Sequence, residues 1–267
     1  MNKHITSPQN SYIKELVQLK EKSRIRKNSN SFLIEGLREI SLAIKGGYAI
    51  STILVDFSIL SEIDFNTISN SISSTFEIIE ITNAVYSKLA LRASTEGIIA
   101  VAQSKDLSLK SMQFSTKTPL ILVAEAPEKP GNIGALLRTA DAAGIDAVFI
   151  ANPKTDMYNP NIIRSSVGCV FTTKIATGTT TEIISFLKEN DIAMYGAALT
   201  ASVEYQTVNY IKSSAIIVGT EATGLSDEWL QNTSQNIVIP MRGTIDSMNV
   251  SVSAAIIIFE AIRQRNP

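Results

Sequence analysis

The sequence of 267 residues contains one cysteine, one histidine and one tryptophan. A single cysteine, Cys169, cannot form an internal disulfide, and this excludes a disulfide framework and suits a reducing cytoplasm. A single histidine, His4, leaves hardly any Ser-His-Asp or Cys-His arrangement available. Zinc sites need several cysteines or histidines, so we expect no metal. An enzyme of this composition would use Arg, Glu, Ser, Asn and a bound cofactor.

Long apolar runs and targeting segments are also missing. No stretch reaches the eighteen apolar residues that a membrane span needs, and the first residues lack the apolar core of a secretory signal. There is no Walker-type phosphate loop and no GxGxxG dinucleotide fingerprint. The hydrophobic fraction of 45% and charged fraction of 18% are typical of an ordered soluble protein. We therefore expect a cytoplasmic protein with no membrane contact.

The length favours two domains, and a polar segment without periodicity, residues 106–118, is expected to link them. Residues 1–105 alternate apolar strand patterns (31–36, 50–56, 75–81 and 97–103) with helical patterns, which predicts a small α/β domain. Residues 119–267 contain six short apolar segments that alternate with helices. This pattern is typical of a parallel sheet covered on both faces.

The net charge of −1 does not favour any particular class of partner, but the charges are unevenly distributed. Residues 14–27 hold six Lys and Arg against two Glu, whereas residues 54–80 hold five acidic residues and no base. The basic run is either a solvated helix end or a patch that contacts phosphates, and charge alone leaves both open. Its candidate RNA-binding residues are Lys20, Lys22, Arg24, Arg26 and Lys27.

Three segments of the second domain follow apolar strands, where ligands bind in parallel α/β sheets. In the first, residues 125–144, a Pro- and Gly-rich loop leads into a helix that we expect Asn132 to cap. Arg138 lies six residues on and could simply pair with Asp141 on the helix surface. Residues 131–134 could form a GxxG nucleic-acid clamp of the KH type, but a KH domain is much smaller than this one.

In the second segment, residues 214–230, an apolar strand ends at Gly219. Gly219 and Gly224 would allow the backbone to approach a ligand closely. Ser226 is a good cap for the next helix. Glu221, by contrast, has no capping role in this glycine-rich turn, which makes it a candidate for chemistry.

The third segment, residues 237–267, places the polar triplet Ser247-Met248-Asn249 between an apolar strand and a helix that is apolar on more than one face. Polar groups between buried elements are costly unless they are paired. The triplet is therefore a candidate site.

In this order and spacing, the three segments resemble the SpoU/TrmH RNA 2′-O-ribose methyltransferases of the SPOUT class. Residues 132–144, 216–228 and 239–255 are similar to that family's three motifs, and residues 161–171 to a further segment. Segments near the N-terminus are similar to the accessory substrate-binding domain of rRNA-directed members. The departures are small: Ala222 and Thr223 stand where relatives often carry Gly or another small or polar residue, and Met248 replaces the commoner Leu.

The resemblance implies an α/β fold in which residues 119–267 form a SPOUT domain with a parallel sheet and a deep trefoil knot, preceded by a small α/β substrate-binding domain. It also implies a homodimer, RNA as the substrate and S-adenosylmethionine as the cofactor. The implied cofactor contacts are Leu199, Gly219, Gly224, Ile239, Met241 and Met248. The N-terminal domain favours ribosomal RNA. A tRNA methyltransferase, a non-catalytic RNA-binding member and a small-molecule α/β enzyme are the alternatives.

The implied reaction is attack by a ribose 2′-hydroxyl on the sulfonium methyl of the cofactor. Because arginine is almost never deprotonated, we expect Arg138 to anchor the adjacent phosphate and stabilise the developing alkoxide, with general-base action left open. Glu221 would orient Arg138 or contact the target nucleotide, and Arg164 would contribute to the RNA or dimer side. The groups expected to position the ribose and the polar tail of the cofactor are Asn132, Ser247 and Asn249.

Overall fold

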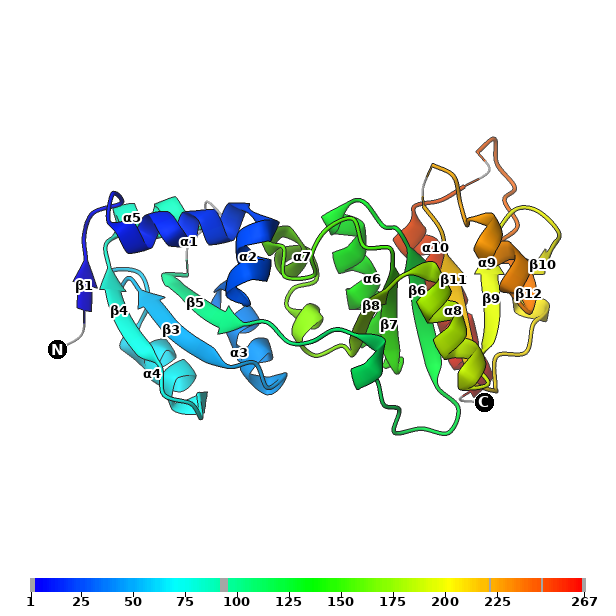
Figure 1. The fold of residues 1–267 in the computed structure, drawn as a ribbon, viewed down its shortest axis with the longest axis horizontal. Helices are drawn as coiled ribbons and strands as arrows, with labels where there is room; N and C mark the ends of the chain where they lie inside the picture. The colour runs from blue at the N-terminus through cyan, green and yellow to red at the C-terminus, as the bar shows by residue number, and fades with distance from the viewer. Residues whose placement is uncertain (1–2, 92–95, 221, 246, 266–267) are drawn as a thin grey trace. The chain divides into compact units, whose positions relative to one another are not determined.

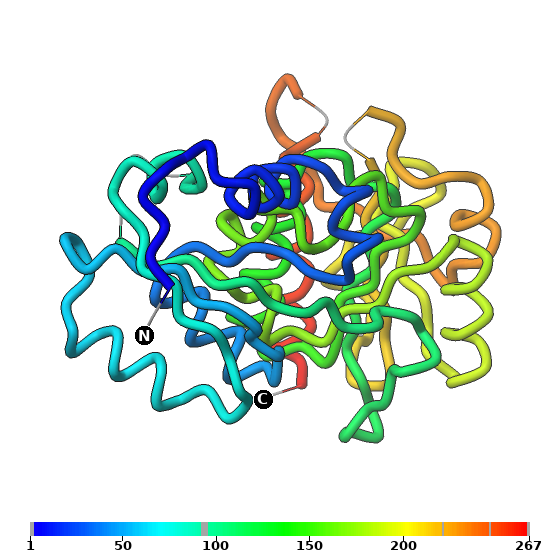
Figure 2. Tube along the Cα trace, turned by 60° about the vertical axis from the view of Figure 1, so that its left-hand side comes forward, coloured from blue at the N-terminus to red at the C-terminus, as the bar shows by residue number. Residues whose placement is uncertain are grey.

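The computed structural model describes residues 3–91, 96–220, 222–245 and 247–265, in two compact units (Figure 1). The first unit comprises Met1–Lys105 and Asp156–Thr172, and the second comprises Asp106–Thr155 and Thr173–Pro267. The chain therefore passes between the units three times, after Lys105, Thr155 and Thr172 (Figure 2). A segment from the second half of the sequence, residues 156–172, thus folds with the N-terminal unit.

The first unit is built on a five-stranded mixed sheet of order β1-β4-β3-β5-β2. Its helices α1 and α5 cover one face of the sheet, and α3 and α4 cover the other (Figure 1). All four predicted strands are confirmed, while the three-residue β1 is too short to show periodicity in the sequence. The bounds are β1 Lys3–Ile5, α1 Ser11–Glu21, α2 Ser23–Ser29, β2 Ser31–Glu35, α3 Leu37–Lys45, β3 Ile50–Val55, α4 Glu62–Ser71, β4 Glu77–Ile81, α5 Asn83–Leu89 and β5 Ile98–Gln103.

Aromatic packing holds the inserted segment, residues 156–172, in the first unit. It contains α7 (Pro160–Ser165) and the 3₁₀ helix η2 (Cys169–Phe171). The ring of Phe32 on β2 stacks on Tyr158 with centroids 4.3 Å apart and on Phe171 at 5.9 Å. Such stacked rings add to the burial of their apolar area. The insertion is therefore part of the first unit's core.

The second unit contains a seven-stranded sheet of order β10-β12-β9-β11-β6-β7-β8, in which every described strand pair is parallel. This confirms the predicted parallel sheet, and the three-residue β10 is again a strand that the sequence pattern does not reveal. The bounds are β6 Leu120–Glu125, α6 Pro130–Ala143, β7 Ala147–Ala151, β8 Ile175–Gly178, α8 Thr180–Glu189, β9 Ala193–Ala197, β10 Ser202–Glu204, η3 Tyr205–Thr207, β11 Ser214–Val218, α9 Asp227–Asn232, β12 Gln235–Val238 and α10 Val250–Arg265.

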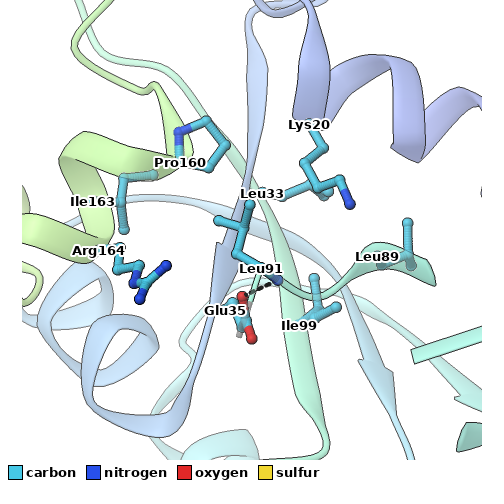
Figure 3. Close-up of a pocket in the computed structure, with 9 residues that line it drawn as sticks. All are labelled: Lys20, Leu33, Glu35, Leu89, Leu91, Ile99, Pro160, Ile163 and Arg164. Carbon is cyan, nitrogen blue, oxygen red and sulfur yellow. Dashed lines mark hydrogen bonds between the residues drawn. The ribbon is translucent and has the colours of Figure 1, made fainter. Parts of the chain in front are cut away.

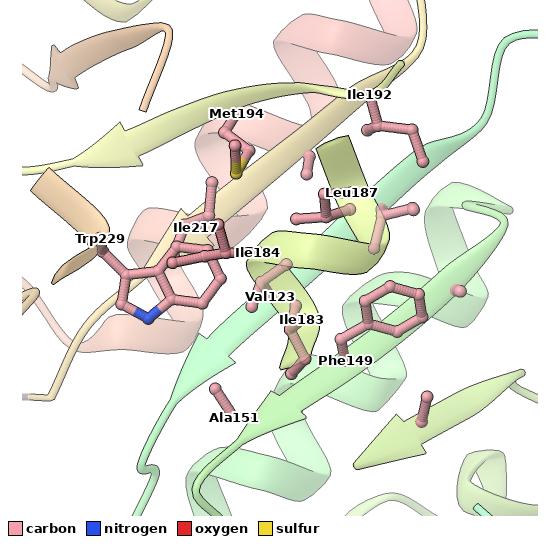
Figure 4. Close-up of a cluster of buried hydrophobic side chains, with 14 of the residues drawn as sticks. Val123, Phe149, Ala151, Ile183, Ile184, Leu187, Ile192, Met194, Ile217 and Trp229 are labelled. Carbon is pink, nitrogen blue, oxygen red and sulfur yellow. The ribbon is translucent and has the colours of Figure 1, made fainter. Parts of the chain in front are cut away.

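Helices cover both faces of this sheet, with α6 and α10 on one side and α8 and α9 on the other. Figure 4 shows the core on the α8 side, a cluster that includes Phe149, Ile183 and the fully buried Trp229. Residues 106–118, expected as a linker, also pack here through η1 (Leu109–Ser111), and Leu109, Met112 and Phe114 contact this core. This segment therefore belongs to the second unit.

Helix α10 buries one side against the second unit. Ala254, Ile257 and Ala261 are at most 1% exposed, whereas Val252 and Phe259 are each 48% exposed. Val252 and Phe259 are seven residues apart and lie on the same side of the helix. Within this chain the helix is therefore not buried all round.

Candidate functional site

A cavity of about 480 Å³ opens where β9, β11 and β12 end. The residues that follow these strands form its walls, and the start of α10 contributes Val250, Ser253 and Ile257. The carboxyl ends of neighbouring parallel strands lie at one edge of the sheet, where ligands bind in such folds. Small-molecule sites span roughly 300–1,000 Å³, so the cavity has the size of a ligand site.

All six residues predicted to contact the cofactor line this one cavity, and so does the predicted Ser247. The six are Leu199, Gly219, Gly224, Ile239, Met241 and Met248. None of the described residues in its walls is charged, and apolar side chains from all three strands and α10 dominate. Its polar lining comes from backbone groups and from the hydroxyl-bearing residues Thr200, Thr220, Thr223, Ser247 and Ser253. The site thus suits a ligand that has an apolar body and polar atoms to which backbone groups can bind.

Gly219 has a more specific role than the sequence suggested. A Cβ at this position would lie 2.1 Å from the carbonyl carbon of Gly224 and 2.5 Å from the nitrogen of Leu225. The space left by the missing side chain is therefore filled by the chain's own backbone, not kept open for a ligand. Thr220 and Gly224 close the loop with reciprocal backbone hydrogen bonds of 3.0 and 3.1 Å. The glycine shapes the cavity wall.

Ser226 lies at the N-terminus of α9 as predicted, but its side chain does not cap the helix. Its hydroxyl donates to Oε1 of Glu125 at 2.7 Å, and its backbone N–H donates to Oε2 of the same carboxylate at 2.9 Å. Glu125, the last residue of β6, is 6% exposed. Sequence reasoning missed this residue, although an acidic residue at the end of an apolar strand was an available signal.

Asn132 is not the cap of α6, because the helix begins at Pro130 with Lys129 in the cap position. Instead, Asn132 Oδ1 accepts a hydrogen bond of 3.1 Å from Nδ2 of Asn249. Asn249 Oδ1 in turn accepts from the backbone N–H of Ser251 at 3.0 Å, in the first turn of α10. The structure thus joins two predicted site residues, next to the cavity-lining Met248. Residues 131–134 lie inside α6, so they form no KH-type loop.

Arg138 is exposed on α6 and is not among the residues that line the cavity. Its guanidinium makes no hydrogen bond or ion pair with the described residues, and the alternative pairing with Asp141 is not formed. An exposed guanidinium can bind an external anion. Glu221, the other predicted catalytic side chain of this region, lies outside the described residues.

The predicted basic residues of the first unit divide into two groups. Lys22, Arg24 and Lys27 are exposed, and Lys20 is half-buried with its ammonium donating to the carbonyl of Lys88 at 3.0 Å. Burial lowers the pKa of the Lys20 ammonium. These four remain on the surface around α1 and α2.

Arg26 is a correction to the predicted phosphate contacts, because it is 3% exposed. Its Nε and Nη2 donate to the two carboxylate oxygens of Asp156 at 3.0 and 2.7 Å, and Nη1 donates to the carbonyls of Leu19 and Lys20. A guanidinium occupied in this way cannot contact RNA. Arg26 instead fixes the inserted segment within the first unit.

Lys20 and the exposed Arg164 line a small pocket of the first unit (Figure 3). Leu33, Leu89 and Ile99 contribute apolar walls, and Glu35 accepts a hydrogen bond from the backbone of Leu91 at 2.7 Å. The insertion, through α7, thus brings Arg164 to the same pocket as Lys20 of α1.

Two classes of site find no support in the part of the chain that the structure describes. No described helix is both long and apolar enough to span a bilayer. Among the same residues, no group of three or more His, Cys, Asp or Glu side chains could hold a metal ion.

Comparison with known proteins agrees with this geometry. Residues 119–259 match the SpoU rRNA Methylase family, and residues 10–100 match the MRM3-like substrate binding domain. The chain is 29% identical over 257 residues to the 23S rRNA (guanosine(2553)-2′-O)-methyltransferase RlmP of Bacillus subtilis, covering 96% of this chain and 98% of the relative.

Solved structures with the same organisation cover the chain almost completely. A crystal structure of an RNA 2′-O ribose methyltransferase has a TM-score of 0.84 and 37% identity, covering 98% of this chain and 99% of that one. An AdoMet-bound rRNA methyltransferase from Sinorhizobium meliloti has a TM-score of 0.89 and 25% identity, covering 98% and 97%. With the family match extending over more than half of its length, the chain belongs to the SpoU rRNA methylase family.

Proposed function

We propose that this protein transfers a methyl group from S-adenosylmethionine to a ribose 2′-hydroxyl in structured RNA, with ribosomal RNA as its substrate. The observation that carries the proposal is that the second and third motif segments line one cavity, while the first is hydrogen-bonded to its rim through Asn132 and Asn249. The relatives' names and the match of residues 10–100 to a substrate-binding domain support RNA as the substrate.

The cavity fits the cofactor. S-adenosylmethionine carries an adenine and a methylthio group that apolar walls accommodate, and Leu199, Met241 and Met248 supply such walls. Backbone groups near Gly219 and Ile239 would bind its polar edges, and Ser247 would bind its polar tail. The cofactor supplies an activated methyl group, so the protein must align the acceptor hydroxyl and handle its charge.

The residues around the cavity suit that task. Arg138 would bind the phosphate next to the target ribose through a bidentate fork and stabilise the negative charge that develops on the 2′-oxygen. Asn132 and Asn249, joined by their hydrogen bond, would position the ribose at the cavity rim. Glu221 would orient Arg138 or contact the target nucleotide.

The first unit would hold the RNA. Its exposed Lys22, Arg24 and Lys27, with Lys20 and Arg164 at the nearby pocket, form a basic surface suited to phosphates. Such contacts orient the RNA and carry no base specificity.

We also propose a deep trefoil knot and a homodimer. Family membership and the path of the last segment, which ends in α10 packed against α6 and β11, support the knot. The half-exposed Val252 and Phe259 support a dimer in which α10 packs against a second copy, because burial of apolar area drives association. A cytoplasmic location follows from an rRNA substrate.

The test is methyl transfer in vitro. The protein is incubated with S-adenosylmethionine labelled in its methyl group and with ribosomal RNA or, separately, tRNA, and the RNA is digested to nucleosides. The proposal predicts label in 2′-O-methyl nucleosides from ribosomal RNA. Label in a methylated base, or in tRNA alone, would contradict it.

A further inference from the structure

The carboxylate of Glu125 is buried beside the cavity without lining it. It accepts three hydrogen bonds, two from Ser226 at 2.7 and 2.9 Å and one from the hydroxyl of Thr180 at 3.4 Å. A buried carboxylate is costly unless such donors satisfy it. Glu125 has no role in the reaction outlined above, so we ask what its hydrogen bonds to Ser226 position.

The carboxylate also has support from residues that do not line the cavity. Thr180, the first residue of α8, is 3% exposed, and its hydroxyl accepts a hydrogen bond of 2.9 Å from Nδ2 of Asn152. Asn152 follows β7, the strand that pairs with β6. Three elements of the sheet layer therefore meet at one acidic side chain, which gives the acceptor a defined position.

Ser226 connects this acceptor to the cavity wall. It directly follows the cavity wall, which in this segment is lined by Gly219, Thr220, Ala222, Thr223, Gly224 and Leu225. The reciprocal bonds between Thr220 and Gly224 close the loop internally. The Ser226 hydroxyl and N–H attach the end of the loop to β6 by two charge-assisted hydrogen bonds, which are stronger than neutral ones.

We propose that Glu125 is a positioning residue: through Ser226 it fixes the cavity wall of residues 219–220 and 222–225 and thereby sets the affinity for S-adenosylmethionine. The inference rests on the proposed function, because it takes this cavity as the cofactor site. Glu125, at the end of β6, would thus contribute to cofactor binding without touching the cofactor.

Two variants of the full-length protein separate positioning from general stability. Ser226→Ala and Thr180→Val each remove one hydroxyl donor to the same carboxylate, but only Ser226 belongs to the loop that lines the cavity. Calorimetry gives the Kd for S-adenosylmethionine, and thermal unfolding gives Tm. We expect Ser226→Ala to raise Kd about three- to tenfold, the effect of one lost hydrogen bond. Of the carboxylate's hydrogen bonds, Thr180→Val removes only the long 3.4 Å one and leaves both Ser226 bonds in place, so it should lower Tm and raise Kd much less than Ser226→Ala does.

Further variants sharpen the result. Glu125→Gln keeps the side-chain size but brings an amide donor toward the Ser226 donors, so it should raise Kd and the KM for the cofactor more than Ser226→Ala does. The kcat at saturating cofactor and the affinity for RNA should stay near wild type. Ser226→Thr retains the hydroxyl and should restore wild-type Kd.

The outcomes are decisive. Equal increases in Kd in Ser226→Ala and Thr180→Val would mean that Glu125 only stabilises the fold. The same conclusion would follow if, across all variants, Kd rose in step with the loss of Tm. An unchanged Kd in Ser226→Ala would overturn the inference while leaving the proposed function intact. A wild-type protein that binds no S-adenosylmethionine would overturn both. If Glu125→Gln fails to fold, the comparison of Ser226→Ala with Thr180→Val still tests the proposal.

Discussion

The side-chain amide of Asn249 donates a hydrogen bond to the side-chain oxygen of Asn132 across 3.1 Å, although 117 positions separate the two residues. Asn132 lies in the first turn of α6, and Asn249 directly precedes α10. The same Asn249 accepts the backbone N–H of Ser251. One side chain therefore starts the last helix and joins the first motif segment to the third.

Asn249→Asp separates these two roles. Aspartate keeps the acceptor for Ser251 but loses the donor to Asn132, so we expect near-normal stability and a large loss of methyl transfer. Asn249→Ala loses both and should also lower the free energy of unfolding by about 1 kcal/mol, a typical value for a helix cap. Urea unfolding and turnover measure the two effects. Wild-type turnover in Asn249→Asp would show that the bond between the asparagines is dispensable.

Gly219→Ala should abolish S-adenosylmethionine binding. Its Cβ would lie 2.1 Å from the Gly224 carbonyl carbon, so the loop that lines the cavity must move. Gly131→Ala is the matched control, because its Cβ meets no atom within 4 Å and it lies in a helix, where alanine should stabilise by about 0.5–1 kcal/mol. Calorimetry with normal affinity in Gly219→Ala would refute the assignment of the cavity.

Arg138→Ala should eliminate methyl transfer while the affinity for S-adenosylmethionine stays at the wild-type value, because the exposed guanidinium is assigned to the RNA. Arg138→Lys should fail nearly as badly, since a point charge cannot reproduce a bidentate fork. Turnover and calorimetry on the same preparations make the comparison. A lysine variant with near-normal turnover would rule out the phosphate fork.

Changing Lys22, Arg24 and Lys27 together to serine should weaken RNA binding. Each lost phosphate contact should flatten the log–log salt dependence by up to about one unit. The affinity for S-adenosylmethionine and the methylated position should not change. An RNA affinity that is unaltered across a salt series would mean that these residues are only a solvated helix end.

Arg26→Gln should behave differently from its basic neighbours. Loss of one partner of the buried pair with Asp156 should lower the free energy of unfolding of the first unit by about 3–5 kcal/mol, because the remaining carboxylate is buried without its partner. Denaturant unfolding measures this loss, and the salt slope of RNA binding by folded protein should be unchanged. A wild-type stability would contradict the structural role of Arg26.

The sequence predicted most of the strands, because strands depend on local patterns, whereas the residues that line the cavity were implied by the resemblance to the SpoU/TrmH family. Uninterrupted apolar runs identify strands buried on both faces, and the motif segments follow three of those runs. The capping roles predicted for Asn132 and Ser226 were wrong, because capping rules consider only neighbouring residues. Distant partners, Asn249 and Glu125, bind these side chains instead.

Long-range packing explains the other differences. Arg26 has the sequence environment of a surface cation, and only the fold brings Asp156, 130 positions away, against it. The docking of residues 156–172 in the first unit likewise depends on Phe32 meeting Tyr158 and Phe171. Apolar periodicity in a single segment contains no information on such partners.

Mapping of 2′-O-methyl groups in ribosomal RNA with and without the gene tests the central claim most directly. The account predicts that one ribose methylation disappears when the gene is deleted, returns with the wild-type gene and does not return with the Arg138→Ala variant. An unchanged pattern of ribose methylation in the deletion strain, or full restoration by Arg138→Ala, would contradict it.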